Sequence, residues 1–325
     1  MIQRALQEEM ERILPEGQIL YNEPMDRHCS FRTGGPADAM AVVKTEDEMA
    51  SLLQLLRDSG ESCFLLGRGT NLLIGDGGYR GVIVTAAAAP RTENAKEVPG
   101  GCGGDPAGFP LDGVCVEGNS IIAGAGATLK AAAMAAMEHG LTGLEFAAGI
   151  PGTVGGGLVM NAGAYGGEIR MVTSLVRLLM PDGSVQELTG EEMEFGYRTS
   201  ILRHVDAAAL RAQFELAPGD PEKIRARVLE LSEQRRAKQP LEFPSAGSTF
   251  KRPEGYFAGK LIMDAGLAGY SVGGAQVSEK HCGFVINRGG ATSAQIRTLI
   301  RNVQDKVFED SGIRLEREVI FLGEF

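Results

Sequence analysis

The sequence predicts an α+β protein made of two domains. Its 325 residues correspond to about two domains of roughly 150 residues each. The first half alternates segments of helical periodicity with short strand-like runs. In the second half, a long charged helix is followed by loops, short strands and one amphipathic helix. This change of pattern between the halves favours the α+β class.

The first half contains signals for two helices before its first long loop. Residues 2–14 place apolar side chains on one helical face, so we expect a helix there. Thr45 and Glu48 have the spacing of a capping box, which predicts a second helix starting after Thr45. Strands are expected over residues 62–66 and 82–85.

The middle of the chain predicts a loop, two strand pairs and a helix. Residues 86–113 show no periodicity and are rich in Gly and Pro, which indicates a surface excursion. A strand pair is expected around 114–123, a helix over Thr128–His139, and a hairpin over 174–188.

The second half predicts two helices and a last strand. Asp220 and Pro221 begin a charged helix, and Thr292 with Gln295 forms a second capping-box pattern. The run 318–322 predicts a strand that closes the chain.

Composition and charge exclude several classes of function. The formal net charge is −10, without a basic cluster, which makes nucleic-acid binding an unfavourable reading. The N-terminal helix is acidic and amphipathic, and no apolar run approaches the roughly 18 residues of a membrane span, so we expect a cytoplasmic protein. Five cysteines without a C-x-x-C pattern are expected to be reduced thiols, and four scattered histidines predict no metal site.

Glycine is the unusual feature of the composition. The chain has 45 glycines, roughly twice the average usage. They are densest in GLEFAAGIPGTVGGGLVMNAGAYGG (143–167), and a shorter group, Gly67–Asn71, directly follows a predicted strand. Glycine lets the backbone approach a ligand and turn successive N–H groups toward phosphate oxygens. Two such loops would suit a pyrophosphate with groups at both ends, such as FAD.

The plain alternative is that both segments are turns of a glycine-rich fold. Neither segment is a dinucleotide-binding fingerprint, because the G-x-G spacings at 67–69 and 124–126 lack the third glycine and the later acidic residue. A G-x-x-x-x-G-K-[ST] phosphate loop is also missing from the sequence.

Several long segments closely resemble one enzyme family, the UDP-N-acetylenolpyruvoylglucosamine reductases (MurB) of the bacterial peptidoglycan precursor pathway. The resemblance covers roughly residues 25–325, in order, and is of the shorter type that lacks an extra substrate lobe. The segments are HCSFRTGGPAD (28–38), GRGTNLLIGDGG (67–78), GLEFAAGIPGTVGGGLVMNAGAYGGEI (143–169), FGYRTS (195–200), RRAKQPLEFPSAGSTFKRP (235–253), AGKLIMDAGLAGYSVGGAQVSEKHCGFVIN (258–287) and LEREV (315–319).

The resemblance implies a vanillyl-alcohol-oxidase-type FAD-binding fold of two α/β subdomains with a C-terminal α+β substrate lobe. The FAD-binding region would span residues 1–205, with subdomains of about 1–85 and 86–205. The lobe would span 206–325, with its last strand returning to the FAD region. The implied activity is NADPH-dependent reduction of an enolpyruvyl ether to a lactyl ether on UDP-N-acetylglucosamine, with non-covalent FAD. A monomer acting on a nucleotide sugar is expected.

The resemblance also implies three catalytic residues: Arg198, Ser248 and Glu318. Hydride addition leaves negative charge beside the substrate carboxylate, so the site needs a cation to stabilise it and a proton donor. Arg198 would polarise the carboxylate and Ser248 would donate the proton, aided by Lys238 or Lys251. Glu318 would be protonated, or would orient a water or Arg198.

Each of these residues has a simpler explanation. Arg198 could be a surface salt bridge and Ser248 a turn residue after glycine. Glu318 could be a solvated strand residue, and the choice between Glu318 and Glu316 rests on the family motif alone. His28 and His281 lie inside family motifs without a required role, so we interpret them as structural.

The remaining site predictions are binding residues. For the substrate they are Tyr197, Lys238, Lys251 and Arg252, although Arg252 and Ile320 depart from the longer type's pattern at the diphosphate contacts. For FAD they are Arg32, Gly67, Arg68, Gly69, Thr70, Asn71, Ile150, Pro151, Gly152, Thr153, Gly155, Gly156, Gly157 and Asn161.

Two other functions stay open at this point. The first is an oxygen-dependent flavin oxidase of an alcohol or sugar on the same fold. Many such oxidases hold flavin covalently through a histidine in an RSGGH-like motif, whereas this chain has RTGGPAD. The second is a non-catalytic nucleotide-sugar sensor, against which the presence of Arg198, Ser248 and Glu318 argues.

Overall fold

The computed structural model describes residues 2–86 and 109–325. Nearly all of the expected excursion over 86–113, with Cys102, lies outside the described residues. The chain forms two compact units that interleave along the sequence. The first comprises Met1–Leu20, Ala39–Arg68 and Gly81–Gln234, and the second comprises Tyr21–Asp38, Gly69–Arg80 and Arg235–Phe325. The expected boundary at residue 205 separates a predicted FAD-binding region from a predicted substrate lobe, and it stays a prediction.

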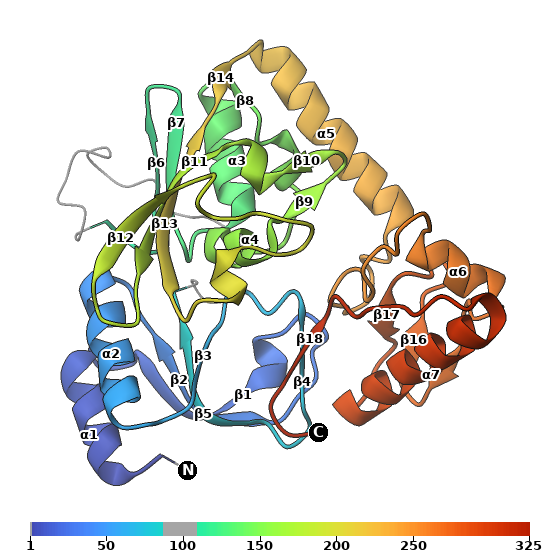
Figure 1. Cartoon of the computed structure of the whole chain (residues 1–325), viewed down its shortest axis with the longest axis horizontal. Helices are drawn as coiled ribbons and strands as arrows, with labels where there is room; N and C mark the ends of the chain where they lie inside the picture. Colours follow the sequence, from blue (N-terminus) through green and yellow to red (C-terminus); the bar gives the residue numbers. More distant parts are fainter. Residues whose placement is uncertain (1, 87–108) are drawn as a thin grey trace. The chain divides into compact units, whose positions relative to one another are not determined.

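A five-stranded antiparallel sheet is the centre of the first unit, with the strand order β12-β11-β13-β7-β6 (Figure 1). The expected hairpin is confirmed, because β11 pairs with β12 from Leu175↔Thr189 to Leu179↔Val185. Buried apolar side chains of the sheet pack against α3 and α4. The elements are β6 (Val114–Glu117), β7 (Ser120–Gly124), α3 (Leu129–Glu138), α4 (Val154–Met160), β11 (Thr173–Leu179), β12 (Val185–Thr189) and β13 (Ala208–Glu215).

A second sheet has the order β1-β2-β5-β3. In its first-unit part, β3 runs parallel to β5, from Cys63↔Val82 to Leu65↔Val84. Helices α1 and α2 contact each other, and their apolar faces share a buried cluster with β2 and β5. The elements are α1 (Arg4–Ile13), β1 (Ile19–Pro24), β2 (Pro36–Val42), α2 (Glu46–Asp58), β3 (Cys63–Leu65) and β5 (Tyr79–Thr85).

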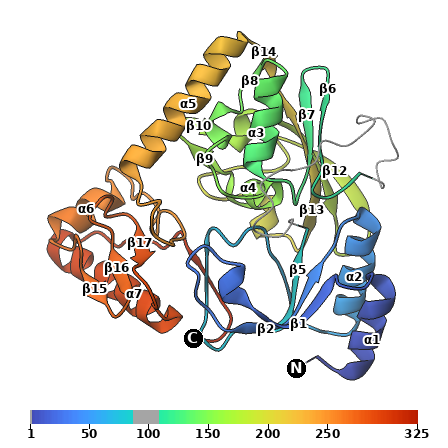
Figure 2. The ribbon, with the colours of Figure 1, turned by 180° about the vertical axis from the view of Figure 1, so that it is seen from behind.

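The second unit contains a small antiparallel sheet, β15-β16-β17, against which α7 packs (Figure 2). In the same unit β18 runs parallel to β4, from Ile320↔Leu72 to Leu322↔Ile74. The last strand is therefore shorter than the expected run 318–322, and its partner lies early in the chain. The elements are β4 (Leu72–Ile74), α6 (Ala258–Asp264), β15 (Ser271–Val272), β16 (Ala275–Val277), β17 (Val285–Asn287), α7 (Ser293–Ser311) and β18 (Ile320–Leu322).

The charged helix expected after Asp220 is α5 (Pro221–Lys238), which starts in the first unit and ends in the second. Short strand pairs complete the first unit, and both are antiparallel. They are β8 (Leu141–Thr142) with β14 (Ala217–Pro218), and β9 (Gly163–Ala164) with β10 (Gly167–Glu168).

Threonine side chains cap four helices: Thr45 caps α2, Thr128 caps α3, Thr153 caps α4 and Thr292 caps α7. Thr292 and Gln295 form the complete capping box at α7. At α2 the prediction is half right: Thr45 accepts from the Glu48 amide at 3.1 Å. The Glu48 carboxylate instead accepts from the Lys44 amide at 2.7 Å and from Gln18 Nε2 at 3.1 Å. Gln18, which is buried, thus binds the Glu48 carboxylate, and the second half of the capping box does not form.

The cysteine prediction needs one correction. Cys29, Cys63 and Cys282 are free thiols, as expected. Cys115, however, is disulfide-bonded, so the expectation of reduced thiols is wrong at this position. Pairing depends on distance in the fold, which cysteine counting and spacing do not supply. Within residues 2–86 and 109–325, no helix has both the length and the apolar character needed to cross a bilayer.

Candidate active site

The two glycine-rich segments meet in the first unit at Gly67 and Thr153. A Cβ atom placed on Gly67 would lie 2.6 Å from Thr153 Oγ1, a distance that real side chains do not tolerate. Thr153 is buried and its hydroxyl accepts from the Gly156 amide at 3.1 Å, so it caps α4. Glycine is therefore required at position 67 because the loop after β3 lies directly on this cap.

The short loop Gly67–Asn71 exposes backbone donors. Within the part of the chain that the structure describes, the amides of Gly67, Gly69 and Thr70 have no hydrogen-bond acceptor. The Gly69 carbonyl accepts from the Ser30 amide at 3.1 Å, which fixes the loop from the other side. Gly69 has φ +60°, and a Cβ there would lie 2.1 Å from the His28 carbonyl oxygen. The loop can therefore offer N–H groups to an anionic ligand, as expected.

The long cluster differs from the expectation. The amides of Ile150, Val154, Gly155, Gly156 and Gly157 all donate to acceptors within the chain. Among the described residues of the segment 150–157, only the amides of Gly152 and Thr153 lack an acceptor. Most N–H groups of this segment are thus used within the chain. Two of them, those of Gly152 and Thr153, are available to a phosphate.

Three consecutive glycines in this cluster form part of a helix instead of an open loop. A Cβ on Gly157 would lie 2.6 Å from Ile169 Cδ1, and one on Gly155 would lie 3.0 Å from Ala125 Cβ. These glycines allow α4 to pack closely on its neighbours, which offsets their poor helix propensity. Their role is to let the backbone of α4 pack closely against its neighbours, directly after Gly152 and Thr153.

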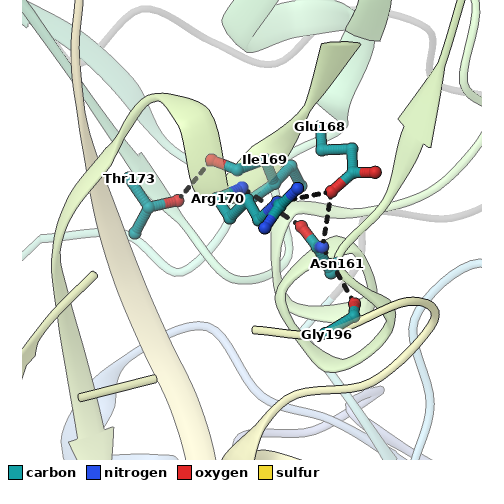
Figure 3. Close-up of polar contacts among 6 residues, drawn as sticks. All are labelled: Asn161, Glu168, Ile169, Arg170, Thr173 and Gly196. Atoms are coloured by element: carbon teal, nitrogen blue, oxygen red, sulfur yellow. Dashed lines mark hydrogen bonds and ion pairs between the residues drawn. The ribbon is translucent and has the colours of Figure 1, made fainter. Parts of the chain in front are cut away.

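Asn161 ends α4 and joins it to the FGYRTS segment (Figure 3). Its side chain is 1% exposed and its backbone is left-handed, with φ +41°. Nδ2 donates to Glu168 Oε2 at 3.0 Å and to the Gly196 carbonyl at 2.9 Å, and Oδ1 accepts from the Arg170 amide at 3.1 Å. Both donor hydrogens are used within the chain, so Asn161 has a structural role, and its expected contact with FAD stays a prediction.

Arg198 and Tyr197 lie on a tight turn in the first unit. Gly196 and Thr199 form an isolated antiparallel bridge around them, and Arg198 has φ +56°. Arg198 Nη2 donates to the Gly163 carbonyl at 3.4 Å, and its guanidinium lies 5.6 Å from the centre of the Tyr197 ring. The Tyr197 side chain is exposed. Asn161 thus anchors the start of the turn at Gly196, and the Gly163 carbonyl binds the Arg198 guanidinium.

In the second unit, the backbone of Glu318 pairs with Thr249, the residue that directly follows Ser248. The Glu318 amide donates to the Thr249 carbonyl at 2.9 Å, and Phe250 pairs with Arg317 in an antiparallel bridge. Thr249 is fully buried, and its hydroxyl accepts from the Val285 amide at 3.0 Å. Ser248 is exposed, and within the described residues its hydroxyl makes no hydrogen bond.

The basic candidates of the second unit have different surroundings. Lys251 pairs with the Glu316 carboxylate, whereas Lys238 is exposed at the last residue of α5. The Arg252 guanidinium lies 3.9 Å from the centre of the Phe257 ring, and its Nε donates to the Tyr256 carbonyl at 3.3 Å. Arg32 is exposed, with φ +54°, and Arg68 is half-buried.

The two histidines in the recognised motifs have structural contacts, as interpreted from the sequence. His28 Nε2 lies 2.8 Å from Glu23 Oε1. His281 Nδ1 accepts from the Gly283 amide at 3.2 Å, and its ring packs edge-on against Phe284 at 4.9 Å. Burial lowers the pKa of His281 because the charged imidazolium is poorly solvated there.

Two functional contacts were not foreseen from the sequence. Thr249 joins Ser248 to Glu318, and the Asn71 side chain binds the Glu318 carbonyl. Both are pairings between segments far apart in the chain, for which local periodicity carries no signal. The structure brings two of the three catalytic candidates together in the second unit, and the third, Arg198, belongs to the first.

Comparison with known proteins identifies the class to which this fold and site belong. A family model described as an FAD binding domain matches residues 37–189. The model for the C-terminal domain of UDP-N-acetylenolpyruvoylglucosamine reductase matches residues 239–322. The chain is thus an FAD-dependent oxidoreductase with an appended C-terminal domain.

Relatives along the whole chain define the family. The UDP-N-acetylenolpyruvoylglucosamine reductase of Caldanaerobacter subterraneus subsp. tengcongensis is 47% identical over 98% of both chains, and that of Agathobacter rectalis is 48% identical over 96% of both. The crystal structure of the MurB enzyme from Thermus caldophilus superposes with a TM-score of 0.73 and 30% identity, over 94% of this chain and 98% of the other. The chain belongs to the UDP-N-acetylenolpyruvoylglucosamine reductase family. The predicted α+β class and vanillyl-alcohol-oxidase-type FAD-binding fold are confirmed.

Proposed function

We propose that this chain reduces the enolpyruvyl ether of UDP-N-acetylglucosamine to UDP-N-acetylmuramate, with NADPH as reductant and FAD as cofactor, in peptidoglycan precursor synthesis. Membership of the reductase family supports the reaction. The observation that carries the proposal is the backbone link between Ser248 and Glu318 through Thr249. It joins a proton donor to a carboxylic acid in one unit, which is what a reduction ending in proton delivery requires.

The chain's own residues fit FAD. The amides of Gly67, Gly69, Thr70, Gly152 and Thr153 have no acceptor within the described residues, and N–H groups of this kind bind phosphate oxygens. We propose that they hold the pyrophosphate. Arg32 and Arg68 stay candidates for pairing with the negative charge of the cofactor, as the resemblance implies. When bound, FAD supplies the hydride that it has accepted from NADPH.

Three side chains serve the reduction itself. Arg198 pairs with the substrate carboxylate through its planar guanidinium and stabilises the negative charge that develops beside it. Ser248 gives its hydroxyl proton to the carbon next to that carboxylate. Glu318 lies on the backbone segment opposite Thr249, where it can orient the donor or a water molecule.

The structure supports Glu318 over its neighbour Glu316 for this role. Glu316 is exposed and its carboxylate pairs with Lys251. Glu318 is half-buried and its backbone is bound to Thr249 and Asn71. A catalytic carboxyl group needs a fixed position, which Glu318 has.

For the nucleotide sugar we propose Tyr197, Lys238, Lys251 and Arg252. The guanidinium of Arg252 carries a permanent positive charge in a planar fork, which suits a diphosphate. Lys238 is exposed and can pair with the same negative charge, whereas the charge of Lys251 is partly neutralised by Glu316. A cytoplasmic location and a monomeric state stay predictions of the sequence.

The test is anaerobic stopped-flow absorbance of the purified protein, first with NADPH and then with the enolpyruvyl nucleotide sugar. NADPH is expected to bleach the flavin and the sugar to restore it. Ser248→Ala is expected to keep the first step and to lose at least about a hundredfold in the second, since general acid catalysis contributes roughly that much. Ser271→Ala removes an exposed hydroxyl that donates to the Gly269 carbonyl and accepts from Gln276 Nε2, and is the matched control.

Three outcomes would contradict the proposal. Equal slowing of both steps by Ser248→Ala would exclude the proton-donor role. Reoxidation by oxygen but not by the sugar would favour an oxidase of an alcohol or sugar. Flavin that stays attached to acid-precipitated protein would contradict the non-covalent cofactor expected from RTGGPAD.

A further inference from the structure

Asn71 binds the backbone at Glu318 and two residues after it. Its side-chain Nδ2 donates to the Glu318 carbonyl oxygen at 3.1 Å. Its own backbone carbonyl accepts from the Ile320 amide at 3.0 Å. The two residues lie 247 positions apart in the sequence and belong to the same compact unit.

These contacts join the short glycine loop to the segment that carries Glu318. Asn71 is the last residue of Gly67–Asn71 and immediately precedes β4 (Figure 1). Glu318 lies two residues before β18, which runs parallel to β4 and starts at the register Ile320↔Leu72. The strand pair fixes residues after Glu318, and the Asn71 side chain extends the attachment back to Glu318 itself.

Thr249 completes the attachment from the opposite side. Its carbonyl accepts the Glu318 amide at 2.9 Å, while Thr249 is fully buried and bound to Gly283 and Val285. The peptide groups on either side of the Glu318 Cα are therefore both hydrogen-bonded, one to Thr249 and one to Asn71. Two bonded peptide groups fix the Cα and the direction of the Cα–Cβ bond, from which the carboxyl group of Glu318 extends.

We propose that Asn71 is a positioning residue for Glu318, acting through the Glu318 carbonyl. The inference rests on the proposed function, in which Glu318 serves substrate reduction. The Asn71 side-chain amide supplies the donor, whereas an aspartate would place a carboxylate against a carbonyl oxygen. A displacement of about 1 Å in a catalytic group can cost roughly a hundredfold in rate. The loop whose amides hold the pyrophosphate thus also sets the place of the acid.

The experiment is a double-mutant cycle of Asn71→Ala and Glu318→Ala, with the two half-reactions measured separately on FAD-loaded protein. Asn71→Ala is expected to slow substrate reduction about 10- to 100-fold while flavin reduction by NADPH changes less than about twofold. In the Glu318→Ala background the same change is expected to slow substrate reduction by less than about twofold, since the residue it positions is gone.

Amide hydrogen exchange gives a readout that is independent of turnover and of FAD. In Asn71→Ala the amides of residues 318–320 are expected to exchange faster than in wild-type protein, both with and without FAD. Asn71→Ser, which keeps a shorter donor, is expected to lie between the two in exchange and in rate. Asn302→Ala, which removes an exposed amide bonded to the Tyr270 hydroxyl, is the matched control and should change neither.

Two results would overturn the proposal. Unchanged exchange at residues 318–320 would show that Asn71 does not hold this segment. Equal slowing in the wild-type and Glu318→Ala backgrounds would show that Asn71 acts elsewhere, for example on FAD alone. Failure of the proposed function looks different: wild-type protein would not reduce the sugar, while the exchange difference at 318–320 would persist.

Discussion

Gly67 lies directly against Thr153, so that a single methyl group on Gly67 would come within 2.6 Å of the Thr153 hydroxyl oxygen. The contact joins two segments, each of which keeps N–H groups without acceptors among the described residues. The geometry of the proposed pyrophosphate site therefore depends on residue 67 being a glycine, without a side chain. This relationship leads to the first prediction.

Gly67→Ala is expected to weaken FAD binding by at least about tenfold, because the loop and the α4 cap must move apart. Equilibrium dialysis or fluorescence titration with FAD measures the loss. Adding Thr153→Ala removes the hydroxyl and leaves the two Cβ atoms 3.7 Å apart, an ordinary contact. The double variant should recover much of the affinity, at a cost in stability of about 1 kcal/mol for the lost helix cap. If the double variant bound FAD no better than Gly67→Ala, the clash would not be the cause.

Asn161 combines a left-handed backbone with three side-chain hydrogen bonds, and the two contributions can be separated. Asn161→Gly keeps the backbone conformation and loses the bonds to Glu168, Gly196 and Arg170, so we expect a loss of about 2–3 kcal/mol in the free energy of unfolding. Asn161→Ala should lose about 1 kcal/mol more, because alanine is strained at positive φ. Urea unfolding measures both, and a more stable alanine variant would contradict the prediction.

Glu46, which is buried at the start of α2, forms an ion pair with the half-buried Arg177, whose Nη1 also lies 3.5 Å from Glu187 Oε1. Arg177 Nε lies 3.0 and 3.2 Å from the two carboxylate oxygens, and Glu46 is only 5% exposed. Glu46→Ala leaves Arg177 short of a partner and should cost about 3 kcal/mol in urea unfolding. Breaking the exposed pair Arg4–Glu8 with Arg4→Ala should cost less than about 1 kcal/mol. Similar losses in the two variants would argue against a special role of burial.

His281 predicts a pH dependence of stability. Burial lowers its pKa in the folded protein, whereas in the unfolded chain it titrates near its ordinary value of 6.5. Between these two pKa values the unfolded state binds more protons, so stability is complete above pH 6.5 and falls as the pH drops toward the folded pKa. In His281→Phe, the midpoint of unfolding should change less with pH over this range. An unchanged slope would show that another group is responsible.

Much of the fold could be predicted because its signals are local. Thr292 with Gln295, the run of apolar residues that follows, and the turn between β11 and β12 each identify their own element. The helix α4 could not be predicted in this way, because Gly155 and Gly157 have poor helix propensity and are favoured only by packing against Ala125 and Ile169. Tertiary contacts therefore stabilise α4 although its local sequence disfavours a helix.

For the candidate site, the sequence indicated residue types better than roles. Glycine density indicated where backbone donors would be found, but most of the donors of the long cluster bind within the chain. Asn161 was expected at the cofactor and proves to anchor the turn of Arg198. Partners such as Thr249 for Glu318 come from pairing between distant segments, and such pairing is not encoded by any local pattern.

The parallel pairing of β18 with β4 has a consequence for biosynthesis. Residues 69–80 emerge from the ribosome long before residues 320–322, which form the strand beside β4. The second unit therefore cannot finish folding until β18 has been translated, and until then the edge of β4 is open to wrong partners. A nascent chain stalled before residue 320 should be more easily cleaved by proteases around 69–80 than the released protein.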